Sequence, residues 1–125
     1  MRPTIDEIML EVAKVLAKRG TCAKKQVGAV ALDSDNRLIA GAYNGAPKHV
    51  DHCTVDNPCL AFTDETKSCW ALHAESNLLL HCDARLVHTV YITEAPCQKC
   101  LMLLQNTNCK RIVWLEGEAV RQVLL

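Results

Sequence analysis

Apolar residues recur at helical spacing near the start of the chain. Thr4 and Glu7 form a capping-box pattern before this run, and a Lys-Arg-Gly sequence at residues 18–20 ends it. The pattern predicts a first helix between these two signals. Its apolar positions are Ile5, Ile8, Met9, Val12, Val15 and Leu16.

Two apolar runs follow, at residues 26–32 and 37–43, and an Asp-Ser-Asp-Asn sequence separates them. Such a sequence is typical of a hairpin loop, so we expect an antiparallel pair of strands. Residues 44–68 contain two prolines, scattered charge and no period, which predicts a long loop.

Helical and strand patterns alternate in the second half of the chain. We expect a helix from about 69 to 82, a strand at 89–93, a helix from about 97 to 106, a strand at 111–115 and an amphipathic segment at 118–125. This alternation favours parallel strands joined by right-handed crossovers. The sequence therefore predicts one α/β domain over residues 1–125, with three layers: a central mixed sheet and helices on both of its faces.

Composition narrows the functional classes. Half of the 125 residues are apolar, so a core can form without disulfides. Lys plus Arg and Asp plus Glu each number 14, which argues against a polymeric nucleic acid as partner. No apolar run approaches about 18 residues and the first ten residues include acidic ones, so we expect no membrane partner and a cytoplasmic location. In a reducing compartment, the eight cysteines point to metal binding or catalysis.

Cys97 and Cys100 stand three residues apart behind Pro96, at the start of a predicted helix. Residues at positions i and i+3 share one helix face, so both sulfurs can reach one point. The unpaired amides at the helix end favour thiolate. A redox pair, half of a structural zinc knuckle, a catalytic metal site and buried filler all fit this motif by itself.

A second motif, His73-Ala74-Glu75, opens the other predicted crossover helix. If both helices begin at the same sheet edge, His73, Cys97 and Cys100 supply three corners of a tetrahedral zinc site and leave the fourth for water. Glu75 is then placed to carry protons as a general base and acid. Together the motifs match the H-x-E and P-C-x-x-C signature of zinc nucleobase deaminases. The alternatives are a redox pair with an unrelated histidine, and a non-catalytic zinc-binding interaction module, which has no use for Glu75.

The chain also resembles the deoxycytidylate (dCMP) deaminases of the zinc-dependent cytidine deaminase superfamily, from about residue 19 to 116. The similar segments are TCAKKQVGAV at 21–30, AYNGAP at 42–47, His52-Cys53, and Cys69 followed by HAESN at 73–77. The resemblance implies a cytidine deaminase-like fold and the conversion of dCMP and water to dUMP and ammonia, which supplies thymidylate synthesis.

The resemblance assigns further roles to individual residues. Asn44 is implied to hold the deoxyribose hydroxyl, although Asn-Gly is also an ordinary turn dipeptide. Ala74 is expected to present its backbone to the pyrimidine. A nucleotide phosphate needs cationic donors, so we expect at least one of Arg19, Lys24 and Lys25 beside it, the alternative being solvated surface lysines.

The family also suggests cofactors and partners. It implies one catalytic Zn²⁺, and allows Mg²⁺ with an allosteric nucleotide, regulation by dCTP and dTTP, and a homo-oligomer, with a hexamer favoured. A second, structural zinc is an alternative to reduced, partly buried cysteines in the long loop. Its candidate ligands are His52, Cys53, Cys59 and Cys69.

Two expectations concern the end of the chain and the substrate. Family members commonly continue from the fourth strand through a helix into a fifth strand, and this sequence stops at Leu125, so we expect the fifth strand to be absent. The rival substrates are dCTP, free cytidine or deoxycytidine, and a tRNA adenosine. Zero net charge disfavours the tRNA.

Overall fold

The computed structural model describes residues 1–21, 25–46, 48 and 72–125. Within these residues a five-stranded mixed sheet has the order β2-β1-β3-β4-β5, in which β3 and β4 are parallel and the other neighbours antiparallel. The helices are α1 (Ile5–Ala17), α3 (Ala74–Leu80), the short 3₁₀ helix η1 (Ala84–Leu86) and α4 (Gln98–Gln105). The strands are β1 (Gly28–Leu32), β2 (Leu38–Tyr43), β3 (Thr89–Ile92), β4 (Arg111–Glu116) and β5 (Ala119–Leu124).

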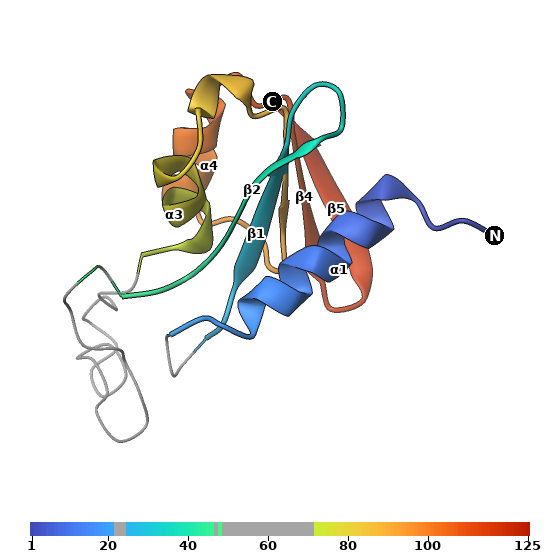
Figure 1. Ribbon diagram of the computed structural model, residues 1–125, viewed down its shortest axis with the longest axis horizontal. Coiled ribbons are helices and arrows are strands. Elements are labelled where there is room, and N and C mark those ends of the chain that lie inside the picture. The colour runs from blue at the N-terminus through green and yellow to red at the C-terminus, as the bar shows by residue number, and fades with distance from the viewer. Residues whose placement is uncertain (22–24, 47, 49–71) are drawn as a thin grey trace.

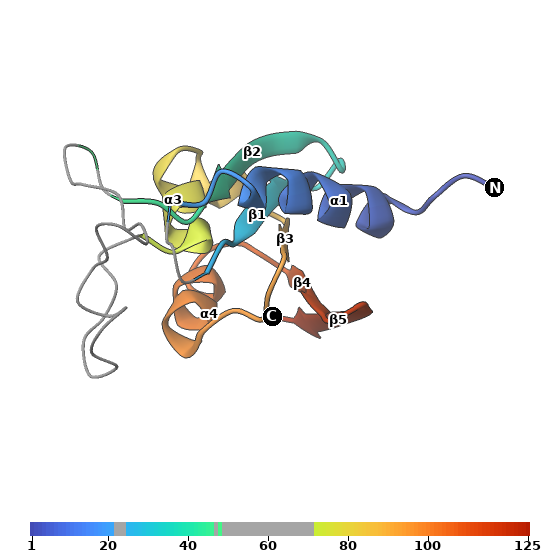
Figure 2. The same ribbon diagram turned by 90° about the horizontal axis from the view of Figure 1, so that it is seen from below.

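Helices cover both faces of this sheet, which confirms the predicted three-layer α/β architecture (Figure 1). Helix α1 crosses one face, while α3 and α4 lie side by side on the other (Figure 2). None of the helices among the described residues has the length and apolar character needed to span a membrane.

Side chains along the central strands point alternately to the two faces of the sheet, so the core has two parts, one on each face. On β1, Val30 and Leu32 pack under α1, whereas Ala29 and Ala31 face α3 and α4. All five residues of β1 are buried, because a central strand with helices on both faces exposes neither side. The smaller core under α1 consists of Leu10, Ala13, Val30, Leu32, Tyr91 and Val113.

The first helix is confirmed as α1, but several of the apolar positions that predicted it are not buried. Leu10 and Ala13 are its buried residues, while Ile5, Ile8 and Val15 are 42%, 41% and 61% exposed. The sheet meets only one side of the helix, so apolar residues on the flanks stay in solvent. The backbone of α1 lies close to the backbone of β1.

Gly28 makes this close approach feasible. A Cβ built on Gly28 would lie 2.0 Å from the carbonyl oxygen of Ala13 and 2.7 Å from the backbone nitrogen of Ala17. Both atoms belong to the helix backbone, which cannot yield as a side chain does. A residue without a side chain at the start of β1 therefore fixes how deeply α1 sits on the sheet.

A polar cluster fastens the start of α1 to the same face. The carboxylate of Asp6 accepts hydrogen bonds from the Tyr91 hydroxyl at 2.6 Å and from both terminal nitrogens of the Arg111 guanidinium. Burial acts to raise the pKa of Asp6, but the hydrogen bonds and the positive charge of Arg111 outweigh it, and that pKa is lowered. Burial and the Asp6 carboxylate raise the pKa of Tyr91 to about 12.

The crossover helix predicted from about residue 69 begins at Ala74 among the described residues, and residues 69–71 lie outside them. Leu72 forms an isolated antiparallel bridge with Gly45, so the chain is still extended just before the helix. His73 is the N-cap residue, with extended backbone at φ −65° and ψ 150°. The bridge therefore sets where α3 begins and places His73 at its N-terminus.

The prediction that the fifth strand is absent is wrong. Residues Ala119–Leu124 form β5, which pairs antiparallel with β4 along its whole length. A two-residue loop joins the strands directly, with no intervening helix, and Gly117 in this loop has a φ of +64°. Positive φ at the first loop position is typical of two-residue hairpins, and glycine adopts it without steric cost.

Candidate functional site

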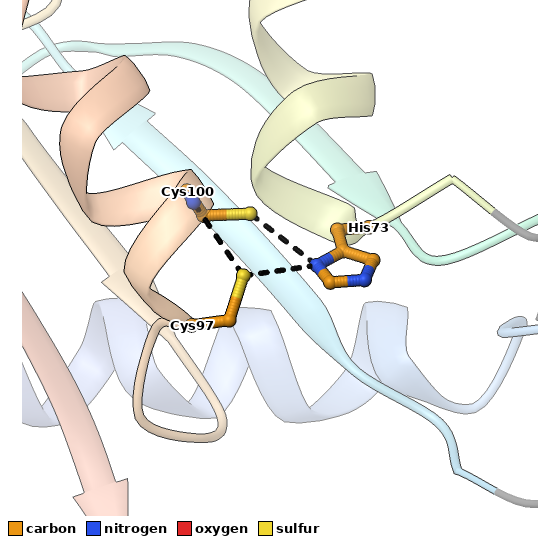
Figure 3. Close-up of side chains that lie close together, drawn as sticks. All are labelled: His73, Cys97 and Cys100. Carbon is orange, nitrogen blue, oxygen red and sulfur yellow. Dashed lines mark hydrogen bonds between the residues drawn. The ribbon is translucent and has the colours of Figure 1, made fainter. Parts of the chain in front are cut away.

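Three side chains from two helix N-termini converge at the carboxyl edge of β3. His73 caps α3 and Cys97 caps α4, while Cys100 lies one turn into α4 (Figure 3). The Nδ1 atom of His73 lies 3.4 Å from the sulfur of Cys97 and 3.3 Å from the sulfur of Cys100. The convergence predicted from the two motifs is thus present in the structure.

The spacing of these ligand atoms fits a tetrahedral zinc ion. Zinc bonds of about 2.3 Å to sulfur and about 2.05 Å to nitrogen give a sulfur–nitrogen edge of about 3.6 Å. The two measured distances are slightly shorter, and all three ligand atoms lie within 4.8 Å of one another. In the described part of the chain no other His, Cys, Asp or Glu completes this group. Three protein ligands are typical of catalytic zinc sites, in which the fourth position takes water or substrate.

The local fold orders the two sulfurs but does not ionise the buried one. The backbone N–H of Cys100 donates to the sulfur of Cys97 at 3.4 Å, as an N-cap interaction. Burial, the charge of Glu75 and the neighbouring Cys97 all raise the pKa of the Cys100 thiol. These surroundings favour the thiol form of Cys100, whereas metal binding requires the thiolate and therefore releases a proton.

Glu75 lies beside the group formed by His73, Cys97 and Cys100 but is not a member of it. It occupies the first turn of α3 and is only 4% exposed. Its charge raises the pKa of Cys100, so its carboxylate lies close to that sulfur. Its neighbour Ser76 has its hydroxyl 4.0 Å from the sulfur of Cys100. A buried carboxylate next to a candidate metal site is well placed to move protons.

The side chain of Asn44 is buried and already forms two hydrogen bonds within the protein. Its Oδ1 accepts from the Val27 backbone N–H at 2.8 Å, and its Nδ2 donates to the Lys25 carbonyl at 2.7 Å. One N–H and one lone pair remain for a substrate hydroxyl. The amide therefore has a structural role, whereas the predicted sugar contact stays a prediction.

Other polar contacts hold the segments around the site. The Thr21 hydroxyl accepts from the Ala46 backbone N–H at 2.8 Å, and the Asn77 side chain donates to the Tyr43 carbonyl at 3.1 Å. Thr93 accepts from the Gly28 backbone N–H at 3.1 Å. Sequence reasoning did not single out Thr21 or Thr93 for these roles, although a hydroxyl residue beside a strand end is a common partner for free backbone groups.

The predicted phosphate-binding residues are only partly described. The Lys25 ammonium forms an ion pair with Glu94 at 2.5 Å. Arg19 is exposed just after α1, and Ala74 is fully buried at the start of α3. Lys24 lies outside the described residues, and so do the candidate ligands of a second zinc. These ligands are His52, Cys53, Cys59 and Cys69.

Sequence and structure comparisons match this chain to known deaminases. The sequence model of the family described as "Cytidine and deoxycytidylate deaminase zinc-binding region" matches residues 3–116. A deoxycytidylate deaminase of Mycobacterium phage D29 is 33% identical over an aligned length of 123 residues, and the match covers 90% of this chain and 95% of the phage protein. The deoxycytidylate deaminase of Schizosaccharomyces pombe is also 33% identical, over 121 residues. The match spans 90% of this chain but only 37% of the yeast protein.

The fold has solved counterparts. The crystal structure of dCMP deaminase from the cyanophage S-TIM5, in complex with dCMP and dUMP, matches with a TM-score of 0.72 and 21% identity. The match covers 91% of this chain and 82% of that structure. At this identity the match supports the same fold, which was the fold expected from the sequence.

Proposed function

The chain belongs to the cytidine and deoxycytidylate deaminase zinc-binding family, and we propose from this premise that it hydrolyses dCMP to dUMP and ammonia. The observation that carries the proposal is the convergence of His73, Cys97 and Cys100 beside the buried carboxylate of Glu75. The phage relative of nearly equal length, named a deoxycytidylate deaminase, supports the choice of dCMP.

We assign Zn²⁺ to His73, Cys97 and Cys100, because two thiolates and an imidazole suit zinc far better than magnesium. Zinc held there supplies Lewis acidity, which lowers the pKa of a water molecule toward about 7. With both cysteines bound as thiolates, their negative charges offset the two positive charges of the zinc ion. His73 is exposed, so substrate can approach from its side, whereas Cys100 is buried at the back.

Glu75 carries the protons of the reaction. Its carboxylate takes a proton from the attacking water as the new carbon–oxygen bond forms at C4 of the cytosine ring, and passes it to the adjacent ring nitrogen. Glu75 then takes the remaining proton from the hydroxyl on C4 and delivers it to the exocyclic nitrogen, so that the carbon–nitrogen bond breaks, ammonia leaves and C4 becomes the carbonyl of uracil. Because Glu75 is buried, few water molecules compete for its protons.

Substrate contacts complete the proposal. The Ala74 backbone, at the first position of α3, borders the pyrimidine, and Asn44 contacts the sugar with its remaining hydrogen-bonding groups. Lys25, with Arg19 and Lys24, is assigned to the phosphate. Four further predictions stay untested: the single domain over residues 1–125, the second zinc, the cytoplasmic location, and the homohexamer regulated by dCTP and dTTP with Mg²⁺.

Replacement of Glu75 by glutamine tests the mechanism. Gln has the same shape but cannot exchange protons, so we expect kcat to fall by about 10²- to 10⁴-fold. Zinc content, measured by elemental analysis, should equal that of the wild type, because Glu75 is not among the three candidate ligands. Glu116→Gln, a change to an exposed carboxylate on the β4–β5 hairpin, is the control and should leave kcat unchanged.

The substrate is tested separately with an ammonia-release assay on dCMP, dCTP, deoxycytidine, cytidine and a tRNA anticodon stem. We expect dCMP to have the highest kcat/KM. A higher kcat/KM with any other substrate would identify that substrate, and not dCMP, as the preferred one. Bound zinc with no turnover of the whole panel would indicate a non-catalytic zinc-binding module.

A further inference from the structure

The ion pair between Lys25 and Glu94 lies next to the candidate site. The Lys25 ammonium is 2.5 Å from a Glu94 carboxylate oxygen. Glu94 is three residues before Cys97, in the segment that connects β3 to α4. The pair therefore joins the segment before β1 to the segment that delivers a metal ligand.

Hydrogen bonds fix the backbone on both sides of this pair. The Lys25 carbonyl accepts from the buried Asn44 side chain at 2.7 Å. Next to Glu94, the backbone N–H of Thr93 donates to the Gly28 carbonyl at 3.0 Å, and the Thr93 hydroxyl accepts from the Gly28 N–H. Two anchored segments thus bring the opposite charges together, although the side chains themselves are 61% and 40% exposed.

This arrangement means that the cation assigned to the phosphate already has an anionic partner. An exposed ion pair is weak, and a phosphate carries more charge and more acceptor oxygens than a carboxylate. A nucleotide can therefore displace Glu94 from Lys25, but the free energy needed to break the ion pair reduces the net affinity for the phosphate. A nucleoside has no group to make the exchange.

We propose that Glu94 is a specificity-determining residue, which holds Lys25 until the phosphate of a nucleoside monophosphate displaces it. The inference rests on the proposed function. Glu94 then limits the affinity for phosphate-bearing substrates through Lys25 and leaves the affinity for nucleosides unaffected. It touches neither the metal ligands nor the pyrimidine in this role.

The test compares Glu94→Gln, Lys25→Met and the double variant, with dCMP and deoxycytidine as substrates. In Glu94→Gln we expect KM for dCMP to fall about two- to fivefold, with kcat unchanged, because the exposed ion pair no longer competes. In Lys25→Met we expect KM for dCMP to rise about fivefold or more. Neither change should alter kcat/KM for deoxycytidine, and the double variant should match Lys25→Met.

A matched control separates the loss of this ion pair from the loss of an exposed carboxylate in general. Glu116 and Arg121 form another exposed ion pair, at 3.0 Å on the β4–β5 hairpin, so Glu116→Gln should change neither KM. Thermal unfolding of every variant shows that each is folded at the assay temperature. Calorimetric binding of dUMP, compared with deoxyuridine, measures the same phosphate contribution without turnover.

Three results would overturn the inference. Glu94→Gln could lower kcat for both substrates, which would mean that Glu94 positions the Cys97 segment. It could still improve dCMP binding in the Lys25→Met background, which would mean direct repulsion of the phosphate. It could also leave the KM for dCMP unchanged. If the wild-type protein itself does not turn over dCMP, the proposed function fails instead.

Discussion

Removal of the Asp6 charge tests how α1 is held on the sheet. The Asp6 carboxylate accepts hydrogen bonds from Tyr91 and from two nitrogens of Arg111. In Asp6→Asn the remaining oxygen can still accept from Tyr91 and from Arg111 Nη1, but the new amide N–H faces the Nη2 donor of Arg111. The variant therefore loses a charge-assisted interaction and places donor against donor.

The size of the effect follows from burial. A hydrogen bond to a charged group contributes about 1.5–3 kcal/mol. Both side chains of the ion pair are 27% exposed, so solvent screens part of the interaction. We expect Asp6→Asn to lower the free energy of unfolding by about 2–3 kcal/mol at neutral pH, and Tm by roughly 6–15 °C.

Urea unfolding followed by circular dichroism measures this difference. The control is Glu116→Gln, which removes one carboxylate from the exposed pair with Arg121 and should cost less than about 1 kcal/mol. The polar cluster of Asp6, Tyr91 and Arg111 lies under α1, on the sheet face opposite the candidate site. The kcat of folded Asp6→Asn should therefore equal that of the wild type.

The pH dependence gives the effect a signature. The folded pKa of Asp6 is lowered, so its stabilisation is present above the unfolded value of about 3.9 and is lost as the pH falls further. The difference between wild type and Asp6→Asn should therefore shrink below about pH 4. Tyr91 has a raised folded pKa of about 12, so wild-type stability should fall as the pH rises from about 10. An Asp6→Asn cost no larger than that of Glu116→Gln, or one that persists unchanged in acid, would refute this account.

Three more predictions concern packing and metal. Gly28→Ala should destabilise the protein by more than about 2 kcal/mol in urea unfolding, because its Cβ would lie 2.0 Å from the Ala13 carbonyl oxygen; wild-type stability would contradict the close packing. Gly117→Ala should cost about 1 kcal/mol at its positive φ and Gly117→Asn less, which thermal unfolding can compare; equal costs would argue against strain. Removal of metal with phenanthroline should abolish ammonia release but leave the far-ultraviolet dichroism, since neither core contains the full ligand group. Zn²⁺ should restore activity and Mg²⁺ should not.

The metal site shows how far local sequence patterns reach. The spacing of Cys97 and Cys100, and the Pro before them, already placed two sulfurs on one helix face, because those positions lie within one turn. That His73 meets them depends on where α3 begins, and the Gly45–Leu72 bridge fixes that point. The family signature connected the two motifs before any coordinates did, whereas the distances between them required the fold.

The fifth strand was missed for a different reason. The run after Gly117 follows a two-residue hairpin signal, whereas members of the family that the sequence resembles commonly continue from the fourth strand into a helix. The sequence of this segment is also a weak strand pattern, because its apolar and polar residues do not alternate. Most of its residues are exposed in the structure. Pairing with the edge of β4 supplies the partner that the pattern does not reveal.

The sequence by itself determined features whose physical causes lie within a few residues: the Thr4 cap, the turn at residues 33–36, the thiol pair and the ligand types that suit zinc. Only the tertiary structure decided which side of α1 is buried, that Lys25 pairs with Glu94, and that Asp6 binds Arg111 across 105 residues of chain. Contacts of this second kind depend on how strands are ordered and how closely backbones approach. No local pattern encodes that arrangement, because each segment presents the same side chains whatever lies opposite them.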